Sequence, residues 1–149
     1  MSTPSDLEIF ETMHRLIHAY YRRHPVDGAG VELTKNEARN IRFIGQHPGV
    51  TQMEIVADSG ADKGLVARLV KSMVDRGLVI RRTDGAGKRG KACYLSPEGL
   101  KVYEALMRTS AQVASTMLDV LDEPAREALK GALDQLLKRS DELGFQEKP

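Results

Sequence analysis

The sequence contains one cysteine, Cys93, among its 149 residues. A single cysteine excludes an internal disulfide and any metal site built from several cysteines. No segment approaches the ~18 consecutive apolar residues that a membrane-spanning helix needs. The first six residues contain no basic group followed by an apolar run, so we expect no signal peptide. These absences predict a protein of the reducing cytoplasm that has no membrane partner.

Motifs typical of enzymes are also missing. No nucleophile motif and no pair of catalytic carboxylates stands out. The glycine-rich segment 85–90 resembles a phosphate-binding loop, but it leads into a predicted strand rather than into a helix. His14 and His18 have a spacing that can present two imidazoles to one metal. No carboxylate motif accompanies them, so we interpret them as partly buried, hydrogen-bonded side chains. The sequence therefore predicts no enzyme, no metal site and no cofactor.

The charge is unevenly distributed along the chain. The formal net charge is only +1, but residues 61–91 contain nine Lys or Arg and three Asp, a net charge of +6. Residues 1–60 have a net charge of −2 and residues 97–149 a net charge of −3. A basic middle segment between acidic flanks is typical of a protein with a polyanionic partner. A solvated basic face is the alternative that charge alone leaves open.

Six helices and one hairpin are predicted from periodicity and capping signals. Helices begin near residues 3–6, 34, 51, 62, 96 and 122, and two of them open on the capping-box sequences Thr34–Glu37 and Thr51–Glu54. Residues 25–33 are predicted to be a loop. Strands at 79–83 and 91–95 enclose the basic glycine-rich segment and predict a hairpin. The fold class is therefore mainly α with a small β-hairpin.

The first, fifth and sixth helices have long apolar stripes. The stripe of the fifth helix alternates spacings of three and four residues from Leu100 to Leu121 and forms a heptad seam. Such a seam is more apolar surface than a small domain can cover, so we expect segments 5–24 and 97–145 to be dimerisation helices. The chain is predicted to be a single domain, 1–149, with its functional region at 31–97.

The order of elements between residues 31 and 97 is typical of a winged helix-turn-helix. A short capped helix, a turn with glycine, a longer helix and a hairpin follow one another. In the longer helix, Leu65, Val66, Leu69, Val70 and Met73 are predicted to point inward. The opposite side contains Gly64, Ala67, Arg68 and Lys71, with Lys63 at its flank. Small residues let a helix approach the major groove and cations reach phosphates or guanine. An ordinary amphipathic helix with solvated cations is the alternative.

The hairpin tip is slim and basic. Three glycines surround Lys88 and Arg89 between the two strands. An arginine on a thin loop can enter a narrow, electronegative minor groove. The alternative is a flexible surface turn.

At this level of detail the segment from Leu33 to Gly99 resembles the MarR family of bacterial transcription regulators. The matching residues are Thr51–Ile55, Asp62–Val70, Gly77–Arg82 and Tyr94–Gly99, and the flanking helices fit as well. The resemblance implies a homodimer in which the first, fifth and sixth helices form the interface. It also implies that the two winged regions bind a pseudo-palindromic operator and that a small, often phenolic, ligand releases the DNA.

The sequence departs from the family pattern at two places. Gly87 stands where the wing usually has an aspartate that orients the arginine, and Asp84 is the available substitute. Gly64, Leu65 and Ala67 replace the serine and threonine that are frequent in the recognition helix. Fewer hydroxyl groups shift recognition from bases toward phosphates and DNA shape.

The function predicted from these residues is that of a double-stranded DNA-binding regulator, a ligand-responsive repressor that acts as a homodimer. The residues predicted to contact DNA are Thr51, Gln52, Lys63, Gly64, Ala67, Arg68, Lys71, Arg81, Lys88, Arg89 and Lys91. An alternative is a winged-helix module that binds proteins and has little affinity for DNA.

A small aromatic acid is the predicted effector. Met13, His14, Ile17, Arg39 and Phe43 are expected at the junction between the dimer helices and the winged region. The ring would bury apolar area while the carboxylate pairs with Arg39. The alternative is that these side chains simply pack the junction.

Cys93 suggests a second mode of control. It lies on a predicted strand near Lys91 and Arg89, whose charges would lower its pKa if it were exposed. A redox-sensing thiol is therefore one interpretation, and a small hydrophobic residue in the core is the other.

Overall fold

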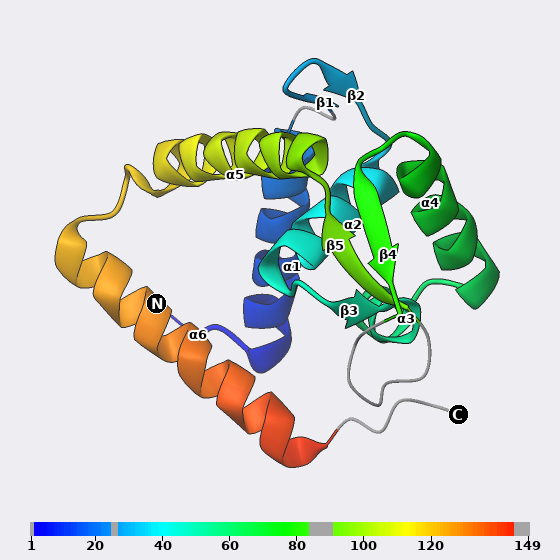
Figure 1. Ribbon diagram of the computed structural model, residues 1–149. Helices are drawn as coiled ribbons and strands as arrows, with labels where there is room; N and C mark the ends of the chain where they lie inside the picture. Colours follow the sequence, from blue (N-terminus) through cyan, green and yellow to red (C-terminus); the bar gives the residue numbers. More distant parts are fainter. Residues whose placement is uncertain (1, 25–26, 84–90, 145–149) are drawn as a thin grey trace. The chain divides into compact units, whose positions relative to one another are not determined.

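The computed structural model describes residues 2–24, 27–83 and 91–144. The chain divides into two compact units, residues 1–113 and 114–149. The described residues form six α-helices and five short strands (Figure 1). None of these helices is long and apolar enough to cross a bilayer. Lys88 and Arg89, predicted at the wing tip, lie outside the described residues.

The first two helices begin where the capping signals predict. Helix α1 spans Asp6–Arg22 and is capped by Ser5, whose side chain accepts a hydrogen bond from the backbone of Glu8. Helix α2 spans Lys35–Gln46 and is capped by Thr34 in a complete capping box. The cap residues satisfy donors that the first turn of a helix leaves free.

Helices α3 and α4 form the predicted helix-turn-helix. Helix α3 spans Gln52–Ser59 and is capped by Thr51. Gly60 follows in the left-handed region, with φ of 63°, which ends the helix and turns the chain. Helix α4 spans Lys63–Asp75, and its N-cap Asp62 accepts a hydrogen bond from the backbone of Leu65. Both helices begin within a residue of their predicted starts, 51 and 62.

The predicted hairpin is confirmed and is part of a larger sheet. Strands β4 (Val79–Arg82) and β5 (Ala92–Leu95) pair antiparallel, with Arg81 opposite Cys93. A third strand, β3 (Val50–Thr51), pairs with the other edge of β5, so the order is β3-β5-β4. The short strand β3 has no sequence signal of its own, because its pairing is decided by the distant strand β5.

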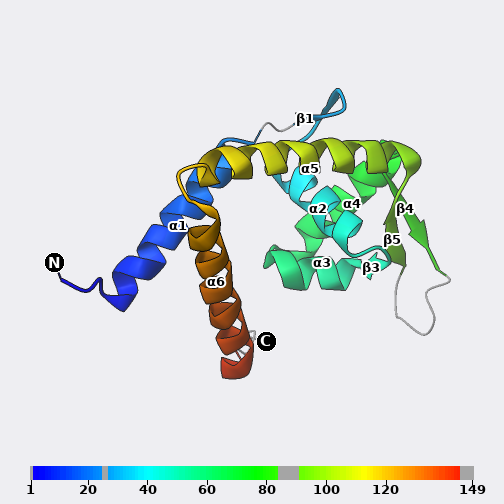
Figure 2. The same cartoon turned by 90° about the vertical axis from the view of Figure 1, so that its left-hand side faces the viewer.

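The prediction of a loop over residues 25–33 is wrong in part. Strands β1 (Asp27–Gly28) and β2 (Val31–Glu32) form a two-stranded hairpin. Ala29 and Gly30 make its turn, both with positive φ, as in the tight turns that suit twisted strands. The hairpin lies beside α5 (Pro97–Leu118), and a Cβ at Gly28 would be 3.0 Å from the carbonyl oxygen of Val102 (Figure 2).

The core of the first unit lies where α2, α3 and α4 gather beside the sheet (Figures 1 and 2). The largest fully buried side chains are Ile41, Ile44, Ile55, Met73 and Leu106. Helix α5 contributes Val102 and Leu106, which the predicted heptad seam leaves out. Leu100, the first seam residue, is exposed. The stripe of α5 that packs in the core is therefore offset from the predicted one, because two apolar faces share this helix.

The second unit contains α6 (Glu123–Leu143), which begins at the N-cap Asp122 with a proline in its first turn. The Arg126 guanidinium donates hydrogen bonds to the carbonyl oxygens of Leu118 and Leu121. Five leucines of α6 are exposed, and Leu137 is 67% exposed. Helix α1 of the first unit is similar, with Leu7, Phe10 and Ile17 all more than half exposed.

Candidate nucleic-acid interface and pocket

Helix α4 separates an apolar inner face from a basic outer face, as its sequence predicts. Val66, Val70 and Met73 are buried, and Leu65 and Leu69 are half-buried. Lys63, Gly64, Arg68 and Lys71 are exposed on the other side, and Ala67 is half-buried. Because hydrophobic packing holds the inner face, the outer face can meet a ligand without disturbing the core.

The cations of this outer face are available to bind. Lys71 Nζ lies 2.9 Å from Asp75 Oδ2, but both side chains are more than 60% exposed. Exposed pairs of this kind contribute little, about 0–1 kcal/mol, so an anion can replace Asp75 as the partner of Lys71. Arg68 lies one turn before Lys71, and Lys63 lies in the first turn.

The predicted contacts from α3 and the sheet have different surroundings. Thr51 is buried, and its hydroxyl accepts a hydrogen bond from the Glu54 backbone, so this side chain caps α3. Gln52 Oε1 accepts a hydrogen bond of 3.1 Å from Arg81 Nη1. The structure thus joins Gln52 to Arg81, while Lys91 is exposed just before β5.

Arg82 is a surface cation that the sequence analysis did not select. It is exposed at the end of β4, and its guanidinium lies 5.4 Å from the centre of the Tyr94 ring. Cation–π contact holds an arginine in place while its N–H groups stay available. The sequence does contain a signal for Arg82. It follows Arg81 at the end of a strand, and because successive strand residues face opposite ways, the two arginines are expected on different sides of the sheet.

Cys93 is fully buried in the middle of the sheet. Burial raises the pKa of its thiol, an effect that the positive charge of Arg81 opposes only in part. A reactive cysteine needs exposure and a low pKa, so the structure favours a packing role over redox sensing.

A pocket of about 630 Å³ lies among α1, α2, the end of α3 and the middle of α5. Of the five residues predicted for an effector site, Arg39 and Phe43 line it. Helix α1 contributes Tyr20, Tyr21 and His24 from its C-terminal end, whereas Met13, His14 and Ile17 are not among the lining residues. The pocket meets α1 near its C-terminal end rather than at the predicted residues, because the position at which α1 meets α2 depends on the packing of the whole unit.

Cations outnumber anions around this pocket. Lys35, Arg39 and Arg42 of α2 line it, and Asp58 of α3 is the acidic residue among the lining side chains. Arg39 Nη2 donates a hydrogen bond of 3.2 Å to the Asp58 carbonyl oxygen and lies 4.0 Å from its carboxylate. The pocket therefore suits an anion, and Arg39 links α2 to α3.

His24 is held at the pocket by two hydrogen bonds. Its Nδ1 lies 2.8 Å from the Tyr20 carbonyl oxygen, which can only accept, so Nδ1 carries a proton. Its Nε2 lies 3.0 Å from Ser110 Oγ of α5. In the neutral ring Nε2 accepts from this serine.

The interpretation of His14 and His18 as partly buried side chains is wrong. Both are exposed on α1, and their ring centres are 4.7 Å apart in an edge-to-face arrangement. Among the described residues, no group of three His, Cys, Asp or Glu side chains could hold a metal ion.

Comparison with known proteins gives consistent results. The sequence model of the MarR family matches residues 30–90. The transcriptional regulator HosA of Escherichia coli O127:H6 is 31% identical over 96 residues, which are 64% of this chain and 71% of HosA.

Solved structures have the same fold at low sequence identity. The transcriptional regulator PcaV of Streptomyces coelicolor, solved in complex with its natural ligand, is 20% identical with a TM-score of 0.65, over 94% of this chain and 99% of PcaV. MepR of S. aureus, solved in a complex with DNA, is 20% identical with a TM-score of 0.63, over 91% of this chain and 96% of MepR.

Proposed function

The chain belongs to the MarR family of transcriptional regulators, and from this premise we propose that it is a homodimeric, ligand-responsive repressor that binds double-stranded DNA. The observation that carries the proposal is the outer face of α4. Lys63, Arg68 and Lys71 are exposed there beside Gly64, on a helix whose inner face is buried in the core. This is the arrangement that places a recognition helix in a major groove.

Each part of the winged region has its own role in this proposal. Arg68 contacts a base edge, Lys63 and Lys71 contact phosphates, and Arg81, Arg82 and Lys91 extend the positive surface over the sheet. For Lys88 and Arg89, which lie outside the described residues, we propose contact with the minor groove, where a narrow A·T-rich segment attracts arginine. The DNA complex solved for the similar protein MepR supports this assignment.

Salt dependence tests the DNA-binding part. DNA fragments that the purified protein captures from its own genome are sequenced, and the affinity for the enriched site is measured at several salt concentrations. The logarithm of affinity should fall with the logarithm of salt by about 0.9 for each phosphate neutralised. The triple variant Lys63→Gln/Arg68→Gln/Lys71→Gln should show a smaller slope and weaker binding.

A charge-matched control is available on α6. The variant Lys130→Gln/Lys138→Gln/Arg139→Gln removes the same charge from a helix outside the winged region, so its slope should equal that of the wild type. Undetectable or salt-independent DNA binding by the wild type would favour a protein-binding module instead.

The dimer is proposed from the apolar faces of the terminal helices. Leu7, Phe10 and Ile17 of α1 and the leucines of α6 are exposed in the single chain. A stable soluble protein rarely leaves such stripes uncovered, and a second copy covers them symmetrically. Two winged regions would then contact half-sites about one helical turn apart.

The pocket is the proposed effector site. An aromatic acid would place its ring against Phe43 and Tyr20 and its carboxylate on Arg39. Arg39 would then leave Asp58, which loosens the link between α2 and α3. A ligand shifts an equilibrium only through unequal affinity for its two states, and this exchange of partners supplies such a difference. The PcaV complex with its natural ligand supports control by a small molecule.

Titration tests this site. Benzoate and its hydroxylated derivatives are added to the protein–DNA complex, and release is followed by fluorescence anisotropy. We expect release from the wild type and a much weaker response from Arg39→Ala. Release that is equal for both proteins, or release by none of the acids, would rule out the proposed pocket chemistry.

A further inference from the structure

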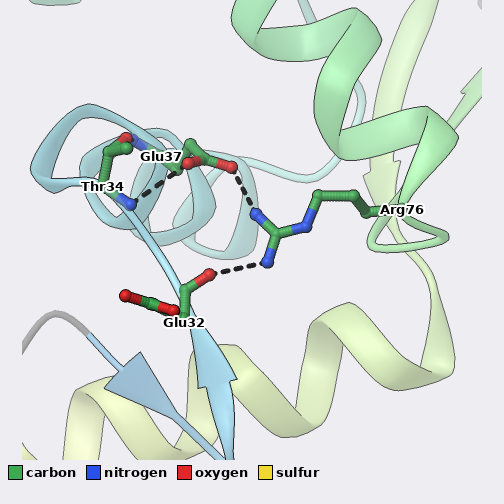
Figure 3. A network of polar contacts seen from close by, with 4 residues as sticks. All are labelled: Glu32, Thr34, Glu37 and Arg76. Carbon is green, nitrogen blue, oxygen red and sulfur yellow. Dashed lines mark hydrogen bonds and ion pairs between the residues drawn. The ribbon is translucent and has the colours of Figure 1, made fainter.

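Arg76 joins the end of α4 to two neighbouring segments, β2 and the start of α2, that lie far earlier in the chain (Figure 3). It is the C-cap residue of α4, directly after the recognition helix. Its Nη1 lies 2.6 Å from Glu37 Oε2 on the first turn of α2. Its Nη2 donates a hydrogen bond of 2.6 Å to the carbonyl oxygen of Glu32 on β2.

Glu37 is also committed to the start of α2. Its Oε1 accepts a hydrogen bond of 3.1 Å from the Thr34 backbone, and the Thr34 hydroxyl accepts one from the Glu37 backbone. The Glu37 side chain is 9% exposed, so its carboxylate has little water to replace a lost partner. A buried charge that loses its partner is strongly unfavourable. The Glu37 carboxylate therefore favours arrangements in which Arg76 stays within hydrogen-bonding distance.

The two charges also suit the helices that carry them. Glu37 lies at the N-terminal end of α2, where the helix dipole favours a negative charge. Arg76 lies at the C-terminal end of α4, where the dipole favours a positive charge. The planar guanidinium presents its N–H donors in a fixed fork, one to each of the two acceptors, whereas a lysine ammonium lacks this fixed geometry.

Hydrophobic packing determines which face of α4 turns toward the core, and directional polar contacts add to it by fixing the end of the helix. The inner face of α4 packs through apolar side chains, and such contacts have no preferred direction. At its N-terminal end, Asp62 bonds to the helix's own backbone. The directional contacts from Arg76 to Glu37 and Glu32 therefore hold the C-terminal end of α4 against α2 and β2.

We propose that Arg76 is a positioning residue that sets the orientation of the recognition helix by fastening it to the first turn of α2. The proposal rests on the proposed function only in taking α4 as the DNA-reading helix. The same turn of α2 contributes Lys35 and Arg39 to the pocket. The orientation of α4 thus depends on the turn that also lines the effector site.

A direct contact between Arg76 and a phosphate is the competing role, since 36% of this side chain is exposed. A double-mutant cycle separates the two roles. Arg76→Met and Glu37→Gln should each weaken DNA binding by about tenfold, and the double variant should be no weaker than the worse single variant. If Arg76 instead contacted a phosphate, Arg76→Met would weaken DNA binding by the same factor in the wild type and in Glu37→Gln.

Lys71→Met is the matched control for a contact residue on the same helix. Its loss of affinity should be nearly the same in the wild type and in Glu37→Gln, because the ion-pair partner of Lys71 is Asp75 and not Glu37. Arg76→Lys keeps the charge but loses the rigid fork of the guanidinium, so its affinity should lie between those of the wild type and Arg76→Met. All affinities are measured well below the melting temperature of each variant.

Hydrogen exchange on the free protein tests the link without DNA. Arg76→Met and Glu37→Gln should both raise the exchange rates of peptides covering residues 33–40 and 72–80, and Lys71→Met should raise neither. If the wild type does not bind DNA, the proposed function fails while this exchange result still tests the link. Unchanged exchange, or equal losses of affinity by Arg76→Met in both backgrounds, would overturn the role of Arg76.

Discussion

Individual residues of the basic segment have different roles because their burial differs. Arg68 and Lys71 are exposed on α4, whereas Arg76 pairs with the buried Glu37. Thr51 caps α3 instead of facing outward. A charged or polar residue in a DNA-binding segment can therefore serve the protein or the DNA, and the surroundings of each side chain decide which.

Arg68 is predicted to read sequence. Arg68→Ala should weaken binding to the preferred site by about 1–3 kcal/mol and relax the base preference at one position of each half-site. Competition with a set of single-base variants of the site measures both effects. Arg108→Ala, which removes an exposed arginine of α5, is the control and should bind like the wild type. An unchanged base preference in Arg68→Ala would limit Arg68 to phosphate contact.

Cys93 is predicted to be unreactive in the folded protein. Its thiol should react with a thiol reagent only on unfolding, because the side chain is 0% exposed. Its pKa is raised above the ordinary value of 9.0, so the folded state holds this proton more tightly than the unfolded state. This tighter proton binding stabilises the folded state fully below pH 9.0, and the stabilisation declines as the pH rises above 9.0.

Denaturation at several pH values tests the second part. The unfolding free energy of the wild type should fall more steeply above pH 9 than that of Cys93→Ala. Rapid labelling of the native protein at neutral pH would restore the redox-sensing interpretation.

At the scale of elements, the end of α4, strand β4 and the start of α5 form one tight junction. Ser96 Oγ donates to the Gly77 carbonyl oxygen at 2.5 Å and accepts from the Gly99 backbone at 3.0 Å. A Cβ at Gly99 would overlap the Leu78 carbonyl oxygen. Glycine is required here by the close approach of α5 to the backbone before β4.

Gly99→Ala should therefore destabilise the protein by about 3 kcal/mol, since the backbone of Leu78 would have to move. Gly131→Ala is the matched control in α6, where a Cβ meets nothing within 4 Å. Gly131 shares its side of the helix with Glu127, Asp134 and Lys138, so alanine there should stabilise α6 by about 0.5–1 kcal/mol. Urea denaturation of both variants measures the difference. Equal stability of the two would contradict the tight junction.

At the scale of the whole molecule, one chain leaves too much apolar surface uncovered. The exposed side chains of α1 and α6 are large and recur on one side of each helix. The winged region, in contrast, has a buried core, which Val102 and Leu106 of α5 complete. We therefore expect folding of the terminal helices to depend on protein concentration, as it does when subunits stabilise each other.

Leu133→Glu should shift the protein from dimer to monomer and lower its melting temperature and its DNA affinity together. Gln135→Glu adds the same charge on the polar side of α6 and should leave the dimer intact. Analytical ultracentrifugation over a range of concentrations distinguishes the two. Truncation after Leu121 should produce aggregates or unstable monomers, and a well-folded monomer from it would contradict the dimer.

Local structure was predictable because its causes lie within a few residues of one another. The caps Thr34, Asp62 and Asp122 and the 3.6-residue periodicity of α4 determine helices through hydrogen bonds and faces that the sequence displays directly. Together with the hairpin, they were enough to predict the winged helix-turn-helix and its basic outer face.

Only the tertiary structure decided which distant residues meet. Glu37 and Arg76 are 39 residues apart, β3 pairs with a strand that lies far along the chain, and the pocket takes the C-terminal end of α1 instead of its middle. Such contacts depend on how the helices pack around the core, and periodicity carries no information about the height at which two helices cross. The sequence alone therefore determined the elements and the basic outer face of α4, while packing determined how α4 is held and where the pocket lies.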